Sequence, residues 1–196
     1  MKNTLAFSLL AALLLIFTWV SASEDISRDL SDGIVRLHIL ANSDTAEDQA
    51  LKLKVRDRLL TEAKKSSKPL TDSEIQKVCE AEIKENGYSY TAKIERGRFY
   101  FPQKNYENLT LPAGDYNAVR IVIGEGNGQN WWCVMYPPLC FTESSTGRLD
   151  EKALASLKSA VSPESFSMIC ESDTIAIKPS FKLVELWNEL KASFHK

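Results

Sequence analysis

The stretch that decides the fold reads Gly124-Glu125-Gly126-Asn127-Gly128-Gln129-Asn130-Trp131-Trp132-Cys133-Val134-Met135-Tyr136-Pro137-Pro138-Leu139-Cys140-Phe141. Its glycines, adjacent tryptophans, paired prolines and two cysteines are unlike the residues of an ordinary polar loop. Glycines spaced in this way predict a tight turn that needs positive φ angles, and paired prolines predict a corner. The structural turn residues that we predict are Gly124, Gly126, Gly128, Pro137 and Pro138.

Strand-like runs flank this turn on both sides. Tyr116–Ile123 is the clearest strand pattern in the chain, and Trp131–Tyr136 follows the turn, so the sequence predicts a hairpin. Neighbouring side chains of a strand point to opposite faces. We therefore expect one of Trp131 and Trp132 to lie in the core and the other to be exposed.

The residues of this stretch do not assemble a recognisable catalytic or metal site. A nucleotide loop would need a helix, or Gly-Lys-Ser/Thr, after the glycines, and neither follows. Cys133 with His38 as its base is the one nucleophile pair to consider, although a strand histidine is more often packed and hydrogen-bonded. Histidines and cysteines at metal-ligand spacing are missing from the sequence. We predict no catalytic residues, no metal and no cofactor.

The N-terminus has the pattern of an export signal. Lys2 precedes an apolar run from Leu5 to Val20, and small and polar residues follow. We predict a signal peptide over residues 1–22 and a single globular domain over residues 23–196. The alternative is an uncleaved anchor, since the apolar run is only slightly shorter than a membrane span.

Charge and cysteine content limit the expected partners and indicate possible disulfides. The chain has 24 basic and 26 acidic side chains without a basic stripe, so nucleic acid is not an expected partner. Its four cysteines allow disulfides in an exported protein. Cys133 and Cys140 are the closest pair and a possible disulfide, if the Pro-Pro corner turns the chain back. Otherwise both are small buried residues.

Upstream, a strand and a helix are predicted in succession. Ile34–Leu40 reads as a strand, with Arg36 and His38 on one side of it. A capping box of Asp44 and Glu47 begins a helix that runs to about Lys65. Its core stripe is Leu51, Val55, Leu59, Leu60 and Ala63, and its solvated charged face is Lys52, Arg56, Asp57 and Glu62.

The remaining patterns complete an α+β assignment. They predict a helix from the Thr71–Glu74 capping box to about Asn86, sheet over Tyr88–Phe101 with a bend at Gly97, a surface connection over Pro102–Asp115, a helix over Asp150–Val161, a short strand over Ile175–Ile177, and a helix over Ser180–Ser193. We expect a single α+β domain with a mainly antiparallel sheet, two N-terminal helices, and C-terminal helices packed on the sheet.

Three blocks of this sequence resemble the stage II sporulation protein R family. Ile34–Leu60 is similar to the first signature of that family, and Leu111–Phe141 looks like its Gly-Asn-Trp-Trp-Cys-Val-x-x-Pro-Pro-Leu-Cys-Phe block. Phe181–Trp187 is similar to its C-terminal segment. The resemblance spans nearly the whole chain, although Ser66–Asn108 carries no motif that matches.

The resemblance implies a signalling role. Members of the family are made in the forespore and exported into the space between the two sporulation membranes. There they activate a membrane-embedded protease of the mother cell, which processes the sigma-E precursor. The chain would then be a ligand and not an enzyme, and would meet the membrane only through its N-terminal segment.

Six residues are our candidates for contact with the partner. They are Trp131, Trp132, His38, Asn42, Asp44 and Arg56. For the polar members at the junction of strand and helix, the competing interpretation is that they cap and brace the helix. Two other functions remain open, namely a secreted thiol hydrolase that uses Cys133 and His38, and a binding module for peptidoglycan or lipid of the cell envelope.

Overall fold

A computed structural model describes residues 14, 18, 25–66, 68–140 and 149–170 of the chain. Its elements in order are β1 (Val35–Leu40), α2 (Ala46–Lys65), α3 (Asp72–Glu85), β2 (Ala92–Phe101), β3 (Lys104–Asn105), β4 (Thr110–Leu111), β5 (Gly114–Ile123), β6 (Asn130–Tyr136), α4 (Glu151–Ala160) and α5 (Pro163–Cys170). Residues 25–33 are also helical. The predicted α+β class with a mainly antiparallel sheet is confirmed.

The main sheet has the order β2-β5-β1-β6. β1 runs parallel to β5 and antiparallel to β6, and β2 runs antiparallel to β5. The predicted hairpin of β5 and β6 is therefore wrong, because β1 lies between them. The connecting segment crosses the end of β1, where the amide of Gly128 donates to the carbonyl of Ala41 at 2.9 Å.

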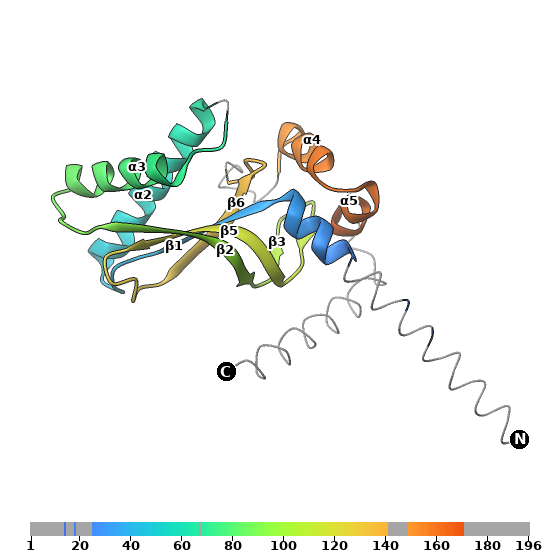
Figure 1. Ribbon diagram of the computed structural model, residues 1–196, viewed down its shortest axis with the longest axis horizontal. Helices are drawn as coiled ribbons and strands as arrows, with labels where there is room; N and C mark the ends of the chain where they lie inside the picture. The colour runs from blue at the N-terminus through green and yellow to red at the C-terminus, as the bar shows by residue number, and fades with distance from the viewer. Residues whose placement is uncertain (1–13, 15–17, 19–24, 67, 141–148, 171–196) are drawn as a thin grey trace, which may run out of the picture.

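Both faces of the sheet are covered. Leu37 and Ile39 of β1 lie in one core, and Ile34, which directly precedes β1, lies in the other. The first core lies under α2 and α3. The second is shared with residues 25–33, β4, α4 and α5. Figure 1 shows α2 and α3 side by side near one end of the sheet, with α4 and α5 near its other end.

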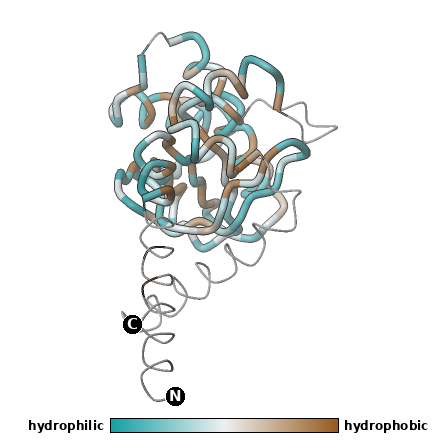
Figure 2. The backbone as a smooth tube through the Cα atoms, turned by 90° about the vertical axis from the view of Figure 1, so that its right-hand side faces the viewer, coloured by the Kyte–Doolittle hydropathy of each residue, from teal (hydrophilic) through white to brown (hydrophobic). Residues whose placement is uncertain are grey.

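The two helices α2 and α3 follow from their sequence patterns. The predicted stripe of α2 is buried at Leu51, Val55, Leu59 and Leu60, and the capping box that begins α3 is present at Thr71 and Glu74. The predicted cap of α2 is wrong by one position. Thr45 is the N-cap, and its side chain accepts a hydrogen bond from the amide of Asp48. Within the described part of the chain, hydrophilic stretches predominate at the outer turns (Figure 2).

Other sequence expectations are also corrected. Gly97 does not bend β2, because it pairs with Ala118 in an unbroken register. The region 102–115 is not a plain surface connection, since it contains β3 and β4 and buries Leu109 and Leu111. Pro163 begins α5, which the sequence analysis did not predict. The predicted elements over 175–177 and 180–193 lie outside the described residues.

Candidate functional site

The tryptophan pair of β6 lies on opposite faces of the sheet. Trp131 packs against the core beneath α2 and α3, and Trp132 packs against the second core. Each side chain is half-buried, so the prediction of one buried and one exposed tryptophan is wrong. The reason is that both faces of the sheet are covered while β6 is its edge strand, so each indole packs against a core and stays partly exposed.

Trp131 lies beneath a cation from α2. The guanidinium carbon of Arg56 lies 4.9 Å from the centroid of the Trp131 ring, within the range of a cation–π contact. The Nη2 atom of Arg56 also pairs with Asp57 at 2.7 Å. Two of the six predicted contact residues, far apart in sequence, are thus brought together on the α2 side of the sheet.

Trp132 has a different companion on the opposite face. The ring of His38 lies 5.8 Å from that of Trp132, and its Nε2 atom lies 2.6 Å from Oδ1 of Asn130. Burial lowers the pKa of His38, so the imidazole is neutral at pH 7. His38 and Trp132 are cross-strand partners, which explains why they meet.

Cys133 and His38 do not form a pair. Cys133 is the cross-strand partner of Leu37 and belongs to the core beneath α2 and α3, whereas His38 faces the other side with Trp132. Cys133 is joined to Cys140 through a disulfide with a Cα–Cα distance of 5.4 Å. Because a disulfide sulfur carries no thiolate, this geometry does not support a nucleophile with an imidazole base.

The junction of β1 and α2 is a hydrogen-bond network. The carboxylate of Asp48 accepts from Oγ of Ser43 at 2.6 Å and from Nδ2 of Asn42 at 2.8 Å, and these bonds lower the pKa of Asp48. Oδ1 of Asn42 accepts from the amide of Glu125 at 3.0 Å. Asn42 therefore braces the glycine turn. Asp44 lies in the same loop, next to the N-cap Thr45.

The glycine turn fits closely against this junction. Gly124 and Gly126 have positive φ angles of 57° and 67°, as a glycine turn requires. A Cβ atom at Gly128 would overlap the backbone carbonyl of Ser43. Gly128 is thus needed because the turn lies so close to the backbone of Ser43. The spacing of the glycines in the sequence does not distinguish this need from a need for a positive φ angle.

The predicted solvated face of α2 is wrong at Lys52. Its side chain is buried, and its Nζ donates to the carbonyl of Gln129 at 2.8 Å and to Oε1 of Gln49 at 2.6 Å. Burial lowers the pKa of Lys52. Together with Arg56 over Trp131, this contact aligns α2 with β6. We call the boundary between α2 and β6 the α2–β6 seam. It begins at the contact of Lys52 with Gln129, passes Arg56 and Trp131, and ends at Met135.

Sequence reasoning missed the role of Arg36. Its guanidinium is buried between two aromatic rings, 4.5 Å from the centroid of Phe101 and 5.2 Å from that of Tyr116. The Nε atom donates to the carbonyl of Cys133 at 3.2 Å. Its Nη1 atom has no hydrogen-bond partner within the described part of the chain. Arg36 therefore acts chiefly as a packed cation of the second core.

The Pro-Pro corner holds the end of β6 in place. The Tyr136–Pro137 peptide bond is cis, and the amide of Leu139 donates back to the carbonyl of Val134 at 3.2 Å. The disulfide of Cys133 closes the same loop. The hydroxyl of Tyr136 accepts from the amide of Leu70 at 3.0 Å, which ties the corner to the segment that joins α2 and α3.

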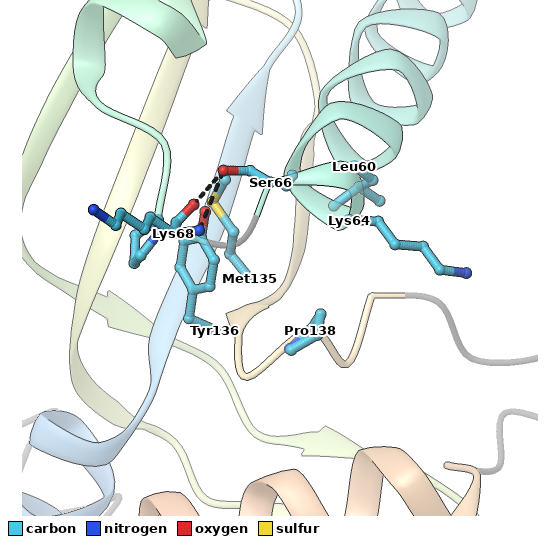
Figure 3. A pocket seen from close by; sticks show the side chains of 9 residues that line it. Leu60, Lys64, Ser66, Lys68, Met135, Tyr136 and Pro138 are labelled. Carbon is cyan, nitrogen blue, oxygen red and sulfur yellow. Dashed lines mark hydrogen bonds between the residues drawn. The ribbon is translucent and has the colours of Figure 1, made fainter.

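A pocket of about 270 Å3 opens at this end of the α2–β6 seam. Figure 3 shows its walls, which come from the last turn of α2, the segment that follows, and the end of β6. The lining residues are Leu60, Ala63, Lys64, Ser66, Lys68, Pro69, Met135, Tyr136 and Pro138. None was among the predicted contact residues. The sequence signals here are the apolar stripe of α2, which includes Leu60 and Ala63, and the predicted corner at Pro138.

Within the described ranges, histidine, cysteine and carboxylate side chains do not cluster in a group that could hold a metal ion. Among the same residues, helices of the length and apolarity needed to cross a membrane are also missing.

Comparison with known proteins yields a family. A profile of the family described as Stage II sporulation protein R (spore_II_R) matches residues 31–146. Stage II sporulation protein R of Bacillus subtilis (strain 168) is 36% identical to this chain over an alignment of 130 residues, and the match covers 60% of this chain. The chain spans 58% of the length of that relative. The search of solved structures found no match.

Proposed function

The chain belongs to the stage II sporulation protein R family, and from that premise we propose that it is an exported signalling protein of sporulation. It passes from the forespore into the intermembrane space and activates a membrane-embedded protease of the mother cell. That protease then processes the sigma-E precursor. In this role the chain is a ligand and not an enzyme, and needs no cofactor.

The observation that carries the proposal is the match over residues 31–146, which includes both sequence signatures. The structure adds that the two signatures contact each other through Lys52 with Gln129 and Asn42 with Glu125. Polar side chains of the first signature are thus used to hold the second in position. Such an arrangement supports a rigid binding surface, because groups that are fixed before binding cost less to order.

The mechanism that we propose is differential binding. If the exported domain binds the active arrangement of the protease more tightly than the inactive one, it shifts the population toward the active form. A hundredfold shift requires about 2.7 kcal/mol of differential contact energy. A few aromatic and arginine contacts supply energies of this size at protein interfaces.

The alternatives have less support. A thiol hydrolase would need Cys133 and His38 together, but the two lie on opposite faces of the sheet. A module for peptidoglycan or lipid has no specific observation in its favour. For localisation, the sequence pattern of residues 1–22 supports export, with a membrane tether if the segment stays uncleaved.

Co-expression tests the proposal. The chain, the membrane protease and the sigma-E precursor are produced together in a cell that does not sporulate, and precursor cleavage is followed by immunoblot. We expect cleavage with the chain present and little without it. Equal cleavage in both cultures would remove the signalling proposal. A culture that lacks the protease controls for cleavage by other enzymes.

A further inference from the structure

The pocket at the end of the α2–β6 seam has the size of a side-chain site. Its volume of about 270 Å3 is below the range of about 300–1,000 Å3 that is usual for small-molecule sites. Much of its lining is apolar, with Leu60 and Ala63 from α2, Met135 from β6, and Pro138 from the corner that follows β6. It therefore suits one apolar anchor residue of a protein partner better than a metabolite.

The rim of the pocket is basic. Lys64 and Lys68 line it, and the sequence between Glu62 and Asp72 contains lysines but no acidic residue. The two flanking carboxylates are already engaged, since Glu62 pairs with Lys65 and Asp72 pairs with Arg96. Among the described residues, no carboxylate pairs with the ammonium group of Lys68. An acidic partner segment is the complement of this rim.

Hydrogen bonds and a disulfide hold the walls of the pocket in place. The Tyr136 hydroxyl holds the amide of Leu70, and Oγ of Ser66 donates to the carbonyl of Lys68 at 2.6 Å. The disulfide between Cys133 and Cys140 closes the loop that carries Pro138. A site whose walls are held in this way binds without a large loss of conformational entropy.

We propose that this pocket receives an apolar side chain, flanked by carboxylates, from the part of the membrane protease that faces the exported chain. The inference rests on the proposed function and names the surface through which it works. The apolar residue of the partner fills the space between Ala63 and Met135. An acidic neighbour of that residue pairs with Lys68 at the rim.

Two variants test the pocket in the co-expression assay with the full chain. Lys68→Glu reverses the charge of the rim at an exposed position, and Ala63→Trp fills the pocket from α2. Lys77→Glu is the matched control, because Lys77 is an exposed lysine of α3 outside the pocket. The amount of chain and its resistance to limited proteolysis are measured for each variant. If Ala63→Trp does not fold, Lys68→Glu alone decides the matter.

The outcomes separate the inference from the function. We expect Lys68→Glu and folded Ala63→Trp to lower precursor cleavage at least about tenfold, and Lys77→Glu to leave it within about twofold. If the wild-type chain activates and the pocket variants activate equally well, the pocket inference is overturned while the signalling function stands. If the wild-type chain fails to activate, the proposed function falls, and the inference falls with it.

Discussion

The Nζ atom of Lys52 on α2 donates a hydrogen bond of 2.8 Å to the backbone carbonyl of Gln129, next to the start of β6. The two residues are 77 positions apart in sequence and belong to the two signature blocks of the family. Lys52 is only 4% exposed, so this bond satisfies a buried ammonium group, although Gln129 itself is exposed. The blocks are therefore one structural unit, and α2 and β6 share one seam.

Removal of the Lys52 ammonium tests how much its hydrogen bond to Gln129 stabilises the fold. Lys52→Met keeps the length and apolar stem of the side chain but leaves the Gln129 carbonyl without this donor. We expect a loss of about 1.5–3 kcal/mol in the free energy of unfolding, the usual value for a hydrogen bond to a charged group. Urea denaturation of the purified chain measures it. Lys77→Met, at an exposed position of α3, is the control and should cost less than about 0.5 kcal/mol.

The close approach of the glycine turn gives a second prediction. Gly128→Ala places a Cβ against the carbonyl of Ser43, so the turn or the loop before α2 must move. We expect a loss of about 2–4 kcal/mol in unfolding free energy from this overlap. Gly97→Ala is the control, because its Cβ would meet only Phe99 at 3.6 Å, an ordinary contact. Equal midpoints of urea denaturation for the two variants would contradict the role that we assign to Gly128.

Local patterns predicted the elements of this fold better than their pairing. The stripe of α2 and the capping box of α3 depend on neighbours in sequence, and both are as predicted. The hairpin of β5 and β6 failed, because the insertion of β1 between them depends on hydrogen bonds from the turn to Ala41 and Asn42. Contacts of this range leave no periodic signal in a single sequence.

The candidate site shows the same limit. Cross-strand register places His38 beside Trp132 and separates it from Cys133, and no spacing in the sequence encodes that register. The helical pattern places Lys52 on the solvated face of α2. The pattern does not reveal its acceptor, since that is a backbone carbonyl far away in the sequence. The pocket residues were missed for a similar reason, since its walls come from the end of α2 and the end of β6.

The network around Asp48 predicts a pH dependence of stability. Hydrogen bonds from Ser43 and Asn42 lower the pKa of Asp48 in the folded chain below its ordinary value of 3.8. A lowered folded-state pKa stabilises the fold above the unfolded-state pKa, and this stabilisation is lost as the pH falls through the folded-state value. Asp48→Asn should therefore be less stable than the wild type at pH 7, and the difference should shrink below about pH 4. Urea denaturation across this pH range gives the difference, and a constant value down to pH 3 would contradict the charge effect.

Loss of the disulfide should change the stability of the chain, and its effect on signalling distinguishes a ligand from a thiol hydrolase. Replacement of Cys133 and Cys140 by serine removes a short cross-link, which should cost about 2 kcal/mol in unfolding free energy. Cys133→Ser and Cys140→Ser break the same bridge, so a ligand is affected equally by both in the co-expression assay, whereas a thiol hydrolase would lose activity only with Cys133→Ser. Cys79→Ser is the control for the loss of a buried thiol that has no bridge. Abolished signalling by Cys133→Ser alone, with both variants folded, would support the hydrolase.

The two tryptophans of β6 provide a matched pair for finding the face that meets the partner. Both are half-buried, so Trp131→Leu and Trp132→Leu should destabilise the chain to a similar degree. Only Trp131 lies on the α2–β6 seam, under Arg56 and on the same side as the pocket. We therefore expect Trp131→Leu to lower precursor cleavage about tenfold, the effect of losing an aromatic anchor, and Trp132→Leu to lower it less than about twofold, after correction for the amount of folded chain. The opposite ranking would place the partner on the face of Trp132 and His38, where the half-buried histidine would then take part in the contact.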